Sequence, residues 1–281
     1  MNINVSFEFF PPKTQMAAIQ LRDNAIILEK MGPHFFSVTF GAGGSTRTGS
    51  IETIKLLQSE TKIPVAPHLS CLGSTFEDIS GLLEVYKNLS LKRIVALRGD
   101  LPAGEKREGD LNFAYELVSF IRKTTNDYFH IEVAAYPEVH PEAPNPTADI
   151  INLKRKFEAG ANSAITQYFF NPDAYFYFKD ECAKENIFSP IIPGIMPITH
   201  FDKLQRFSSI CGAEIPRWLS KRLEMYGDDQ ESIKAFGAEV VYNLCQRLVA
   251  GGAPALHFYT LNQAGPTLNL LQMLGIQGFS L

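Results

Sequence analysis

The stretch INVSFEFFPPKTQMAAIQLRDNAIILEKMGPHFFSVTFG, residues 3–41, carries the pattern on which the fold assignment depends. A short run of β-branched and aromatic residues at 3–10 is followed by a helical pattern at 16–30 and a second apolar run at 35–41. Strand, helix and strand in this order are typical of a βαβ unit, in which a helix joins two parallel strands. The stretch therefore predicts one unit of a parallel sheet.

The same alternation continues along the chain. Further strand-like runs end near Cys71, Gly99, Pro137, Phe170, Pro197 and Asn262. Helical patterns cover residues 48–60, 75–88, 110–124, 147–159, 172–185, 201–210, 229–250 and 266–274, with a proline break at Pro216. Eight strand–helix units predict an α/β fold, a (β/α)8 TIM barrel in one domain (1–281), with extra helices between strands seven and eight. A doubly wound open sheet shows the same alternation, and the strand count alone does not exclude it.

Composition excludes several classes of protein. The chain has 281 residues, of which 45% are hydrophobic and 20% charged, and its formal net charge is −4. No basic block is present, which argues against a nucleic-acid partner. The four cysteines form no CxxC pair, as expected of free thiols in a reducing cytoplasm. No apolar run approaches the roughly 18 residues of a membrane span. A cytoplasmic protein without membrane contact is therefore predicted.

Glu8 is unusual because it lies inside an apolar strand. Side chains alternate along a strand, so Glu8 would face the lumen of a barrel while Phe7 and Phe9 pack under the helices. Burial among phenylalanines would raise the pKa of this carboxyl, which is what a general acid working near pH 7 requires. A structural glutamate paired with an arginine such as Arg98 is the alternative, and the sequence leaves both open. Thr39, His68 and Gln167 occupy the corresponding face of later strands, near the ends where barrels carry their active sites.

Other motifs are ambiguous when taken singly. In VALRGDLP, residues 95–102, Gly99 would allow close approach of a ligand, and Asp100 would either line a site or cap a turn. GAGGST, residues 41–46, lacks the third glycine of GxGxxG, which argues against a Rossmann dinucleotide site. YPEVHPEAPNP, residues 136–146, places two glutamates near His140 without a familiar metal-ligand spacing, so no metal is predicted. The basic run NLKRKFEAG, residues 152–160, is either a solvated face or a diphosphate site.

Together these motifs point to one family. The chain contains, in this order, SFEFFPP, VTFGAGGS, APHLSC, IVALRGD, AAYPEVHPEA, NLKRKFEAGAN, AITQYFF, IPGIMPI and HFYTLN. It thus resembles the methylenetetrahydrofolate reductases, and among them the short bacterial type without a regulatory domain. The resemblance implies FAD at the C-terminal mouth of the barrel and ping-pong chemistry with NADH or NADPH and then methylenetetrahydrofolate. It also implies a role in supplying methyl groups for methionine synthesis, and a homo-oligomer.

The resemblance assigns roles to individual residues. Glu8 would be the general acid that opens the imidazolidine ring to an iminium, and Asp100 would lie beside the flavin and the pterin. Gln167 would hydrogen-bond the pterin, Phe201 would pack on the nicotinamide or the benzoyl ring of folate, and Thr39 would contact the nicotinamide cofactor. The positions that match FAD contacts are Thr39, Phe40, Ala42, His68, Arg98, Gly99, Asp100, Tyr136, His140, Ala143, Asp149, Asn152, Arg155 and Lys156.

Two departures from the family pattern matter. LPAGEKREGD, residues 101–110, is shorter than the corresponding bacterial loop, so FAD contacts there cannot be carried over. Gln263 stands where relatives often have an arginine that would hold the glutamate tail of folate. Phe40 replaces a tyrosine found in relatives, a mild change. Another barrel flavoenzyme, of the proline dehydrogenase type, and a non-catalytic folate- or nucleotide-binding barrel are the alternatives.

Overall fold

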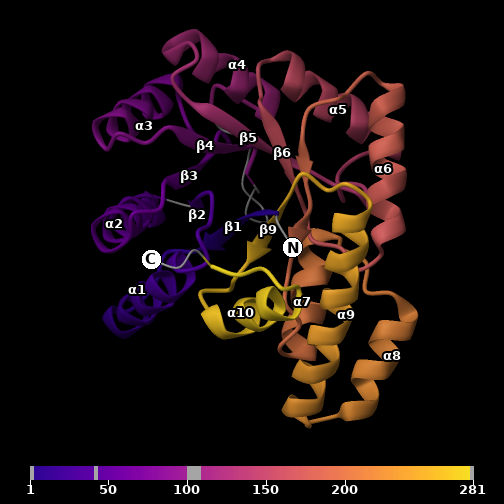
Figure 1. Cartoon of the computed structure of the whole chain (residues 1–281). Coiled ribbons are helices and arrows are strands. Elements are labelled where there is room, and N and C mark those ends of the chain that lie inside the picture. The colour runs from indigo at the N-terminus through magenta and orange to yellow at the C-terminus, as the bar shows by residue number, and fades with distance from the viewer. Residues whose placement is uncertain (1–2, 41–43, 100–108, 279–281) are drawn as a thin grey trace.

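The computed structural model describes residues 3–40, 44–99 and 109–278. Its described strands form one parallel sheet that curls into a ring, with the helices outside it (Figure 1). The strands are β1 (Asn4–Phe9), β2 (Phe36–Val38), β3 (Val65–Ser70), β4 (Arg93–Leu97), β5 (His130–Ala135), β6 (Ser163–Thr166), β7 (Ile191–Ile192), β8 (Gly194–Ile195) and β9 (Ala255–Tyr259). Their order in the sheet is β7-β6-β5-β4-β3-β2-β1-β9-β8.

The predicted TIM-type barrel is confirmed, and its seventh strand is interrupted. β7 pairs with β6, whereas β8 pairs with β9, so the two ends of the sheet are consecutive in the chain. Pro193 separates them and has no N–H with which to continue a ladder. The predicted strand seven is thus two short pieces on either side of a proline, and it brings the two ends of the sheet together.

Gly194 is needed where the barrel closes. A Cβ at this position would lie 2.2 Å from the carbonyl oxygen of Thr166 and 2.6 Å from Cε2 of Tyr259. The N–H of Gly194 donates to Oγ1 of Thr166 at 2.9 Å. Only glycine permits this approach of β8 to the end of β6.

The helices follow the predicted patterns closely. They are α1 (Gln15–Glu29), α2 (Gly44–Glu60), α3 (Phe76–Asn88), α4 (Ala114–Thr125), α5 (Pro146–Glu158), α6 (Pro172–Lys184), α7 (Phe201–Cys211), α8 (Arg217–Tyr226), α9 (Gln230–Ala250) and α10 (Ala264–Met273). The extra helices that the sequence predicts between strands seven and eight are confirmed as α7 and α9. Helix α8 was not predicted; it begins directly after the proline break at Pro216. The start of α2 was predicted too late, because the helix begins at Gly44.

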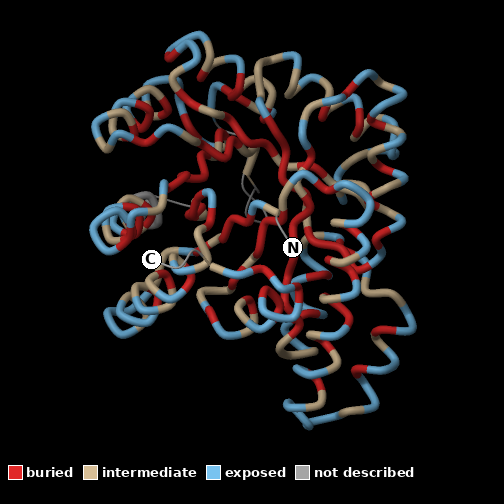
Figure 2. Tube along the Cα trace, viewed as in Figure 1, coloured by how far each residue is buried: buried red, intermediate tan, exposed pale blue. Residues whose placement is uncertain are grey.

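The main hydrophobic core lies between the sheet and the helices, and a second, smaller one fills part of the lumen. Figure 2 shows buried positions concentrated along the ring of strands and on the helix sides that face it. Phe7 and Phe9 are fully buried in the main core, as predicted. The lumen cluster consists of Phe35, Ala66, Val95 and Ile165. Because these residues precede Thr39, His68, Leu97 and Gln167 on their strands or strand ends, they occupy the deeper part of the lumen and leave its C-terminal part open.

A buried carboxylate network lies near the N-terminal ends of β4, β5 and β6. Glu132 is only 1% exposed and accepts hydrogen bonds from Arg93 and, at 2.5 Å, from Oγ of Ser163. Nε2 of His130 is 3.3 Å from the same carboxylate. Burial raises the pKa of Glu132, but these donors outweigh it and hold the pKa below its usual range. In such barrels, charges away from the C-terminal mouth contribute to stability.

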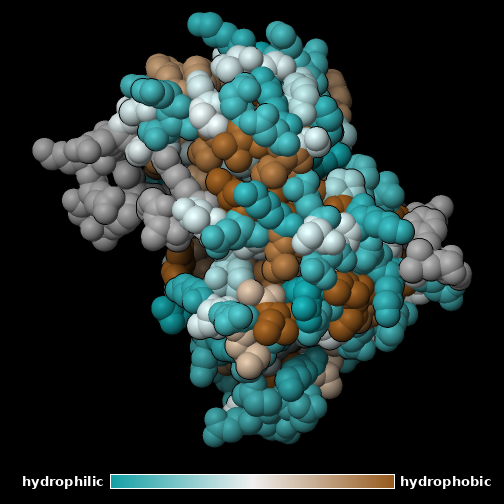
Figure 3. Space-filling model, turned by 90° about the vertical axis from the view of Figure 1, so that its left-hand side faces the viewer, coloured by the Kyte–Doolittle hydropathy of each residue, from teal (hydrophilic) through white to brown (hydrophobic). Residues whose placement is uncertain are grey.

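The outer surface is mostly hydrophilic, with small hydrophobic patches on the face shown in Figure 3. Met16, Ile19 and Ile27 of α1 are among the exposed apolar side chains. None of the helices in the described ranges combines the length and the apolar character that spanning a membrane requires.

Candidate functional site

A cavity of about 400 Å³ opens at the C-terminal ends of the strands, and we call it the central cavity. Its walls bring together residues from β1, β3, β4, β5, β6, β9 and α7 and from the segments that follow β2, β6, β8 and β9. It is lined by Glu8, Thr39, Phe40, His68, Val95, Leu97, Val133, Ala134, Tyr136, Ile165, Gln167, Tyr168, Met196, Phe207, Ile210, Cys211, Tyr259 and Leu261. The structure therefore places Glu8, Thr39, His68 and Gln167 around one space, as the sequence predicts.

Glu8 lies between two imidazoles in this cavity. Oε2 of Glu8 is 3.4 Å from Nε2 of His68 and 3.6 Å from Nε2 of His257, and the Glu8 side chain is 19% exposed. Within the described part of the chain, neither of these ring nitrogens has a hydrogen-bond partner. Burial lowers the pKa of His68, so this imidazole is neutral near pH 7. The carboxylate that Arg98 pairs with is Glu142, not Glu8.

His257 and Ser6 form a pair beneath Glu8 that the sequence analysis did not single out. The two residues are register partners on β1 and β9, and Nδ1 of His257 lies 2.7 Å from Oγ of Ser6. His257 is fully buried, and its ring is stacked on Phe35. The alternation that identified Glu8 also places His257 and Tyr259 on the lumen face of β9, so the signal was present.

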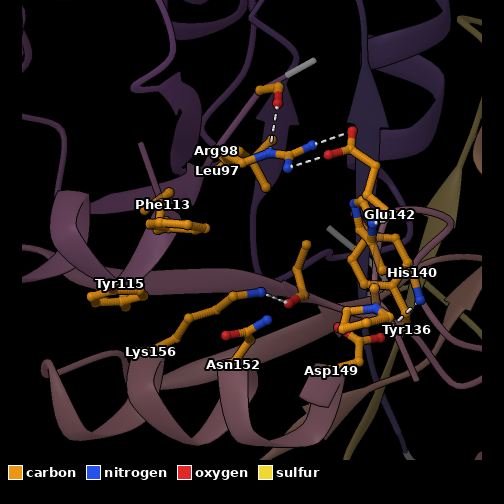
Figure 4. Close-up of a pocket in the computed structure, with 16 residues that line it drawn as sticks. Leu97, Arg98, Phe113, Tyr115, Tyr136, His140, Glu142, Asp149, Asn152 and Lys156 are labelled. Carbon is orange, nitrogen blue, oxygen red and sulfur yellow. Dashed lines mark hydrogen bonds and ion pairs between the residues drawn. The ribbon is translucent and has the colours of Figure 1, made fainter. Parts of the chain in front are cut away.

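A second cavity of about 320 Å³ adjoins the first, and we call it the side cavity (Figure 4). Leu97, Ala134 and Tyr136 line both cavities. The side cavity is lined by Ala96, Leu97, Arg98, Gly99, Phe113, Ala114, Tyr115, Ala134, Tyr136, His140, Glu142, Ala143, Pro144, Asp149, Asn152 and Lys156. It thus gathers most of the predicted FAD positions from β4, β5, the loop after β5 and α5.

Charged groups of both signs surround the side cavity. Nζ of Lys156 donates to the carbonyl oxygen of Ala134 at 2.8 Å, and burial lowers the pKa of this lysine to about 8. Lys156 therefore reaches inward from α5, as Figure 4 shows, and does not lie on a solvated face. On the opposite wall, both terminal nitrogens of Arg98 donate to Glu142 at 2.7 Å. A bidentate guanidinium of this kind can exchange a carboxylate for a phosphate.

The loop after β5 is held by its own hydrogen bonds. Asp149, in the first turn of α5, accepts from the backbone N–H of His140 at 2.8 Å, and Nδ1 of His140 accepts from the N–H of Glu142 at 3.0 Å. Burial and the charge of Arg98 lower the pKa of His140, so its neutral ring carries the proton on Nε2 and can donate it. In the described ranges, no group of three or more His, Cys, Asp or Glu residues has the geometry to hold a metal ion.

Two aromatic residues of the side cavity were also missed. The rings of Phe113 and Tyr115 are stacked, with their centroids 5.5 Å apart, and offer a flat face to a planar ligand (Figure 4). They lie at the start of α4, where the sequence analysis described only a helical pattern. Arg155 is exposed and does not line the side cavity, but its guanidinium lies 5.8 Å from the centre of the Tyr115 ring. It is therefore close to the rim, on the outer side of this aromatic pair.

A third cavity, of about 430 Å³, lies between the end of β8, α9 and α10. Gln263 lines it together with His200 and Lys234. Burial lowers the pKa of His200, and the charges of Lys203 and Lys234 lower it further, which indicates a positive potential at this rim. Because residues 196 and 261 line the central cavity and residues 197 and 263 line the third, the two cavities flank the same strand-end segments.

Some predicted site residues are not brought into these cavities. Phe201 is the first residue of α7 and packs against the main core, and it lines none of the central, side and third cavities. Ala42, Asp100 and the loop 101–108 lie outside the described residues.

The wall contributed by α7 was not predicted. Phe207, Ile210 and Cys211 line the central cavity from this helix. Tyr168, two residues after the end of β6, holds this helix in place. Its hydroxyl lies 3.0 Å from Oγ of Ser208 and accepts a hydrogen bond from the thiol of Cys211 at 3.4 Å. The sequence predicts a helix over residues 201–210 but contains no signal that this helix borders a cavity.

This arrangement can perform two tasks side by side. The side cavity offers cations, a neutral histidine donor and stacked rings, which suit a planar ligand with an anionic group. The central cavity offers a carboxyl group, an amide at Gln167 and largely apolar walls, which suit proton transfer to a heterocycle shielded from water. Their shared wall means that two ligands would meet near Tyr136.

Several known proteins are similar to this chain over nearly its whole length. The family model described as methylenetetrahydrofolate reductase matches residues 1–275. The 5,10-methylenetetrahydrofolate reductase of Escherichia coli (strain K12) is 39% identical over 275 residues, which cover 98% of this chain and 92% of that protein. The protein of the same name from Buchnera aphidicola subsp. Acyrthosiphon pisum (strain APS) is 41% identical over 275 residues, 98% of this chain and 93% of that protein.

Two more distant proteins are also similar. Methylenetetrahydrofolate reductase (NADH) 1 of Arabidopsis thaliana is 36% identical over 284 residues, 96% of this chain but 48% of that protein. A solved structure, an uncharacterized protein from Clostridium thermocellum that binds two copies of 5-methyl-5,6,7,8-tetrahydrofolic acid, superposes with a TM-score of 0.64. It is 18% identical and covers 97% of this chain and 93% of its own, so it supports the fold alone.

Proposed function

The chain belongs to the methylenetetrahydrofolate reductase family, and from that premise we propose that it reduces methylenetetrahydrofolate to methyltetrahydrofolate using FAD and a nicotinamide dinucleotide. The single observation that carries the proposal is the position of Glu8, an acid at the C-terminal mouth of a barrel, in a cavity that shares a wall with a nucleotide-sized site. The reduction itself follows from the family. The cofactors, the ping-pong order and the supply of methyl groups for methionine synthesis are our inferences.

The side cavity supports FAD as the cofactor. Its donor set combines Arg98 and Lys156, which suit a diphosphate, with Asn152 and Asp149, which suit ribose hydroxyls. The ammonium of Lys156 is buried enough to lower its pKa, and an anion bound beside it would offset the cost of that burial. When bound, FAD would accept a hydride from the nicotinamide and pass it to the folate. Phe40, Ala42, His68, Gly99, Tyr136, His140, Ala143 and Arg155 would complete the cofactor site.

Glu8 would supply the proton that the folate reaction needs. Protonation of a ring nitrogen opens the imidazolidine of methylenetetrahydrofolate to an iminium, and the hydride then adds to the iminium carbon. Glu8 points into the central cavity with one oxygen near two imidazoles, and its side chain is 19% exposed, so its proton can be replaced from the cavity. His68 is neutral near pH 7 and therefore places no positive charge beside the Glu8 carboxyl.

Other residues would hold the reactants. Gln167 lines the central cavity and accepts from the N–H of Tyr168 through Oε1, so its amide is fixed with its NH₂ group directed elsewhere, able to donate to the pterin. Thr39 would contact the nicotinamide. Asp100 and Phe201 are assigned from the resemblance alone, to the flavin–pterin region and to the nicotinamide or benzoyl ring.

The third cavity would receive the glutamate tail of folate. Gln263 lines it where relatives often have arginine, and an amide cannot supply the charge that attracts a carboxylate. Lys234 lines the same cavity and would supply that charge. It is 48% exposed and bridges to Glu231 at 2.8 Å, so its attraction for a carboxylate would be modest and dependent on salt.

Some properties of the whole protein are inferences from composition and relatives. We expect a cytoplasmic protein, because the four cysteines are free thiols. We expect a homo-oligomer, and the exposed apolar side chains on α1 are compatible with one. NADH is the simpler choice of donor, since a relative from Arabidopsis carries NADH in its name.

A spectrum and one turnover experiment test the proposed function. The purified protein should show a flavin absorption spectrum that bleaches with NADH or NADPH and returns when methylenetetrahydrofolate is added without oxygen. A proline dehydrogenase-like enzyme would instead be bleached by proline, and a non-catalytic folate-binding barrel would not return the spectrum. Either of these results would refute the proposal.

A further inference from the structure

Two loops that are far apart in the sequence meet beside the cavities. One is the loop after β5, residues 136–145, and the other is the connection from α7 to α8, residues 212–216. Oε2 of Glu138 in the first loop accepts a hydrogen bond from the backbone N–H of Glu214 in the second, at 2.7 Å. Gly212 fits tightly against the first loop, because a Cβ there would lie 2.5 Å from Cγ of Pro141.

We propose that Glu138 is a positioning residue that clamps the end of α7 to the loop after β5 and so fixes the α7 wall of the central cavity. The inference rests on the proposed function, because it treats the central cavity as the place where folate and nicotinamide react. Glu138 lines neither the central nor the side cavity in the described structure, so it acts through the helix and not on a substrate.

The clamp joins the walls of both cavities. The loop that carries Glu138 also provides Tyr136, His140 and Ala143 to the side cavity. The helix that it clamps provides Phe207 and Ile210 to the central cavity. A ligand that orders the loop in the side cavity therefore also restrains α7, and the geometry links the two sites through one hydrogen bond and one tight contact.

The backbone on both sides of the clamp is unusual. Gly212 ends α7 with a φ of 76°, which favours glycine. Val139, directly after Glu138, has a φ of 72°, a conformation that a β-branched residue adopts only at a cost. Strain at Val139 is held in place by the surrounding contacts, which include the bond from its own N–H to the carbonyl of Tyr136 at 3.3 Å and the neighbouring Glu138 hydrogen bond.

The clamp is expected to respond to pH near neutrality. Burial raises the pKa of Glu138, the Glu214 N–H lowers it and the Glu214 carboxylate raises it, and together they bring the pKa to about 7. Tyr168 and, beyond it, Cys211 are the other titratable groups on this side of Glu138, and burial raises the pKa of Tyr168, so its hydroxyl is neutral in this pH range. Because the effect of burial outweighs that of the hydrogen bond, the closed clamp favours the protonated carboxyl, whereas an opened clamp that exposes the carboxyl to water would favour its ionised form. The clamp is therefore tight below about pH 7 and weakens as the pH rises through that value.

The chain carries its own reporter for this movement. Trp218 is the single tryptophan in the sequence and the second residue of α8, directly after the clamped connection. It is 57% exposed, and its ring stands edge-on to Phe236 at 6.5 Å. Loosening of residues 212–216 would change the exposure of this ring and hence its fluorescence.

The test is a fluorescence titration of the holoenzyme between pH 5.5 and 8.5. The wild type should show a transition near pH 7, Glu138→Gln should lose it, and Glu214→Gln should move its midpoint to lower pH because a neighbouring negative charge is gone. Glu224→Gln, which removes an exposed carboxylate from the helix that carries Trp218, should behave as the wild type. A fluorescence transition that keeps its wild-type midpoint in both Glu138→Gln and Glu214→Gln would overturn the proposal.

Steady-state kinetics provide a second readout. Glu138→Ala should raise the KM for methylenetetrahydrofolate about fivefold, as expected for loss of one hydrogen bond, while kcat changes less than twofold. Glu138→Gln retains an acceptor and should restore the wild-type KM; equal KM values in the alanine variant and the wild type would contradict the clamp. If the fluorescence transition follows these expectations but no folate turnover occurs, the clamp stands and the proposed function fails.

Discussion

Nε2 of His68 lies 3.4 Å from Oε2 of Glu8, and the two groups come from β3 and β1 at the mouth of the barrel. Burial lowers the pKa of His68, so near neutrality the contact joins a neutral imidazole to a carboxyl group and is not an ion pair. The carboxyl thus faces the central cavity without a positive charge from His68 beside it. This relationship is the structural basis for assigning the acid role to Glu8.

Lys156 should make FAD binding depend on pH. Burial lowers its pKa to about 8, so the ammonium loses its charge as the pH rises through that value and its attraction for a diphosphate is lost. We expect the FAD affinity of the wild type to fall between pH 7 and pH 9.5. Lys156→Met should bind FAD about tenfold or more weakly at pH 7 and show a flat pH dependence, measured by flavin fluorescence quenching.

Lys154 provides the control for this experiment. It lies on the same helix and pairs with Glu185 at 3.4 Å, and it does not line the side cavity. Lys154→Met should therefore leave FAD affinity within about twofold of the wild type. Equal losses in the two variants would mean that only the net charge of α5 matters, contrary to the assignment of Lys156.

Lys234 should contribute to the binding of the folate tail. We expect Lys234→Gln to raise the KM for methylenetetrahydrofolate about threefold at low salt, because the lysine is partly exposed and screened. The difference should shrink at 0.5 M salt. Lys221→Gln on α8, whose lysine pairs with Glu224 at 2.7 Å, is the matched control, and an equal rise in KM for that variant would remove Lys234 from the site.

Glu132 should stabilise the fold without affecting chemistry. Its carboxylate is buried and holds Arg93, so Glu132→Gln leaves a largely buried guanidinium without its counter-charge. We expect the free energy of unfolding in urea to fall by about 3–5 kcal/mol at pH 7. Because the pKa of Glu132 is lowered in the fold, its contribution is present above the ordinary glutamate pKa and is lost as the pH falls below it.

The surface pair of Glu84 and Lys87 serves as the comparison for Glu132. Their charged atoms are 2.9 Å apart, but the Glu84 side chain is 62% exposed, so Glu84→Gln should change the free energy of unfolding by less than about 1 kcal/mol. A Glu132→Gln variant as stable as Glu84→Gln would show that the buried network contributes nothing to stability.

The barrel could be predicted because its strands and helices carry strong local signals. Alternation at Phe7, Glu8 and Phe9 fixed the two faces of β1, and the predicted start of the third helix is confirmed by the capping box of Thr75 and Asp78. The interruption of strand seven at Pro193 was not predicted, because IIPGIMP reads as one apolar run and only the pairing of β7 and β8 with different neighbours reveals two strands.

The site was predicted only where residues sit on strands or in recognisable motifs. Glu8, His68 and Gln167 are on or directly after strands, and their faces follow from alternation. Phe207 and Cys211 reach the central cavity because α7 folds back over the mouth, a tertiary arrangement that no local pattern encodes. The contact of Glu138 with Glu214 joins residues 76 positions apart and was equally invisible in the sequence.

The role of Glu8 is tested most directly by following the two half-reactions of Glu8→Gln separately in a stopped-flow instrument. Glutamine keeps the size of the side chain and removes its proton. Reduction of the bound flavin by NADH should proceed within a few-fold of the wild-type rate, whereas reoxidation by methylenetetrahydrofolate should slow by about 10²-fold or more. Reoxidation at the wild-type rate in this variant would contradict the account.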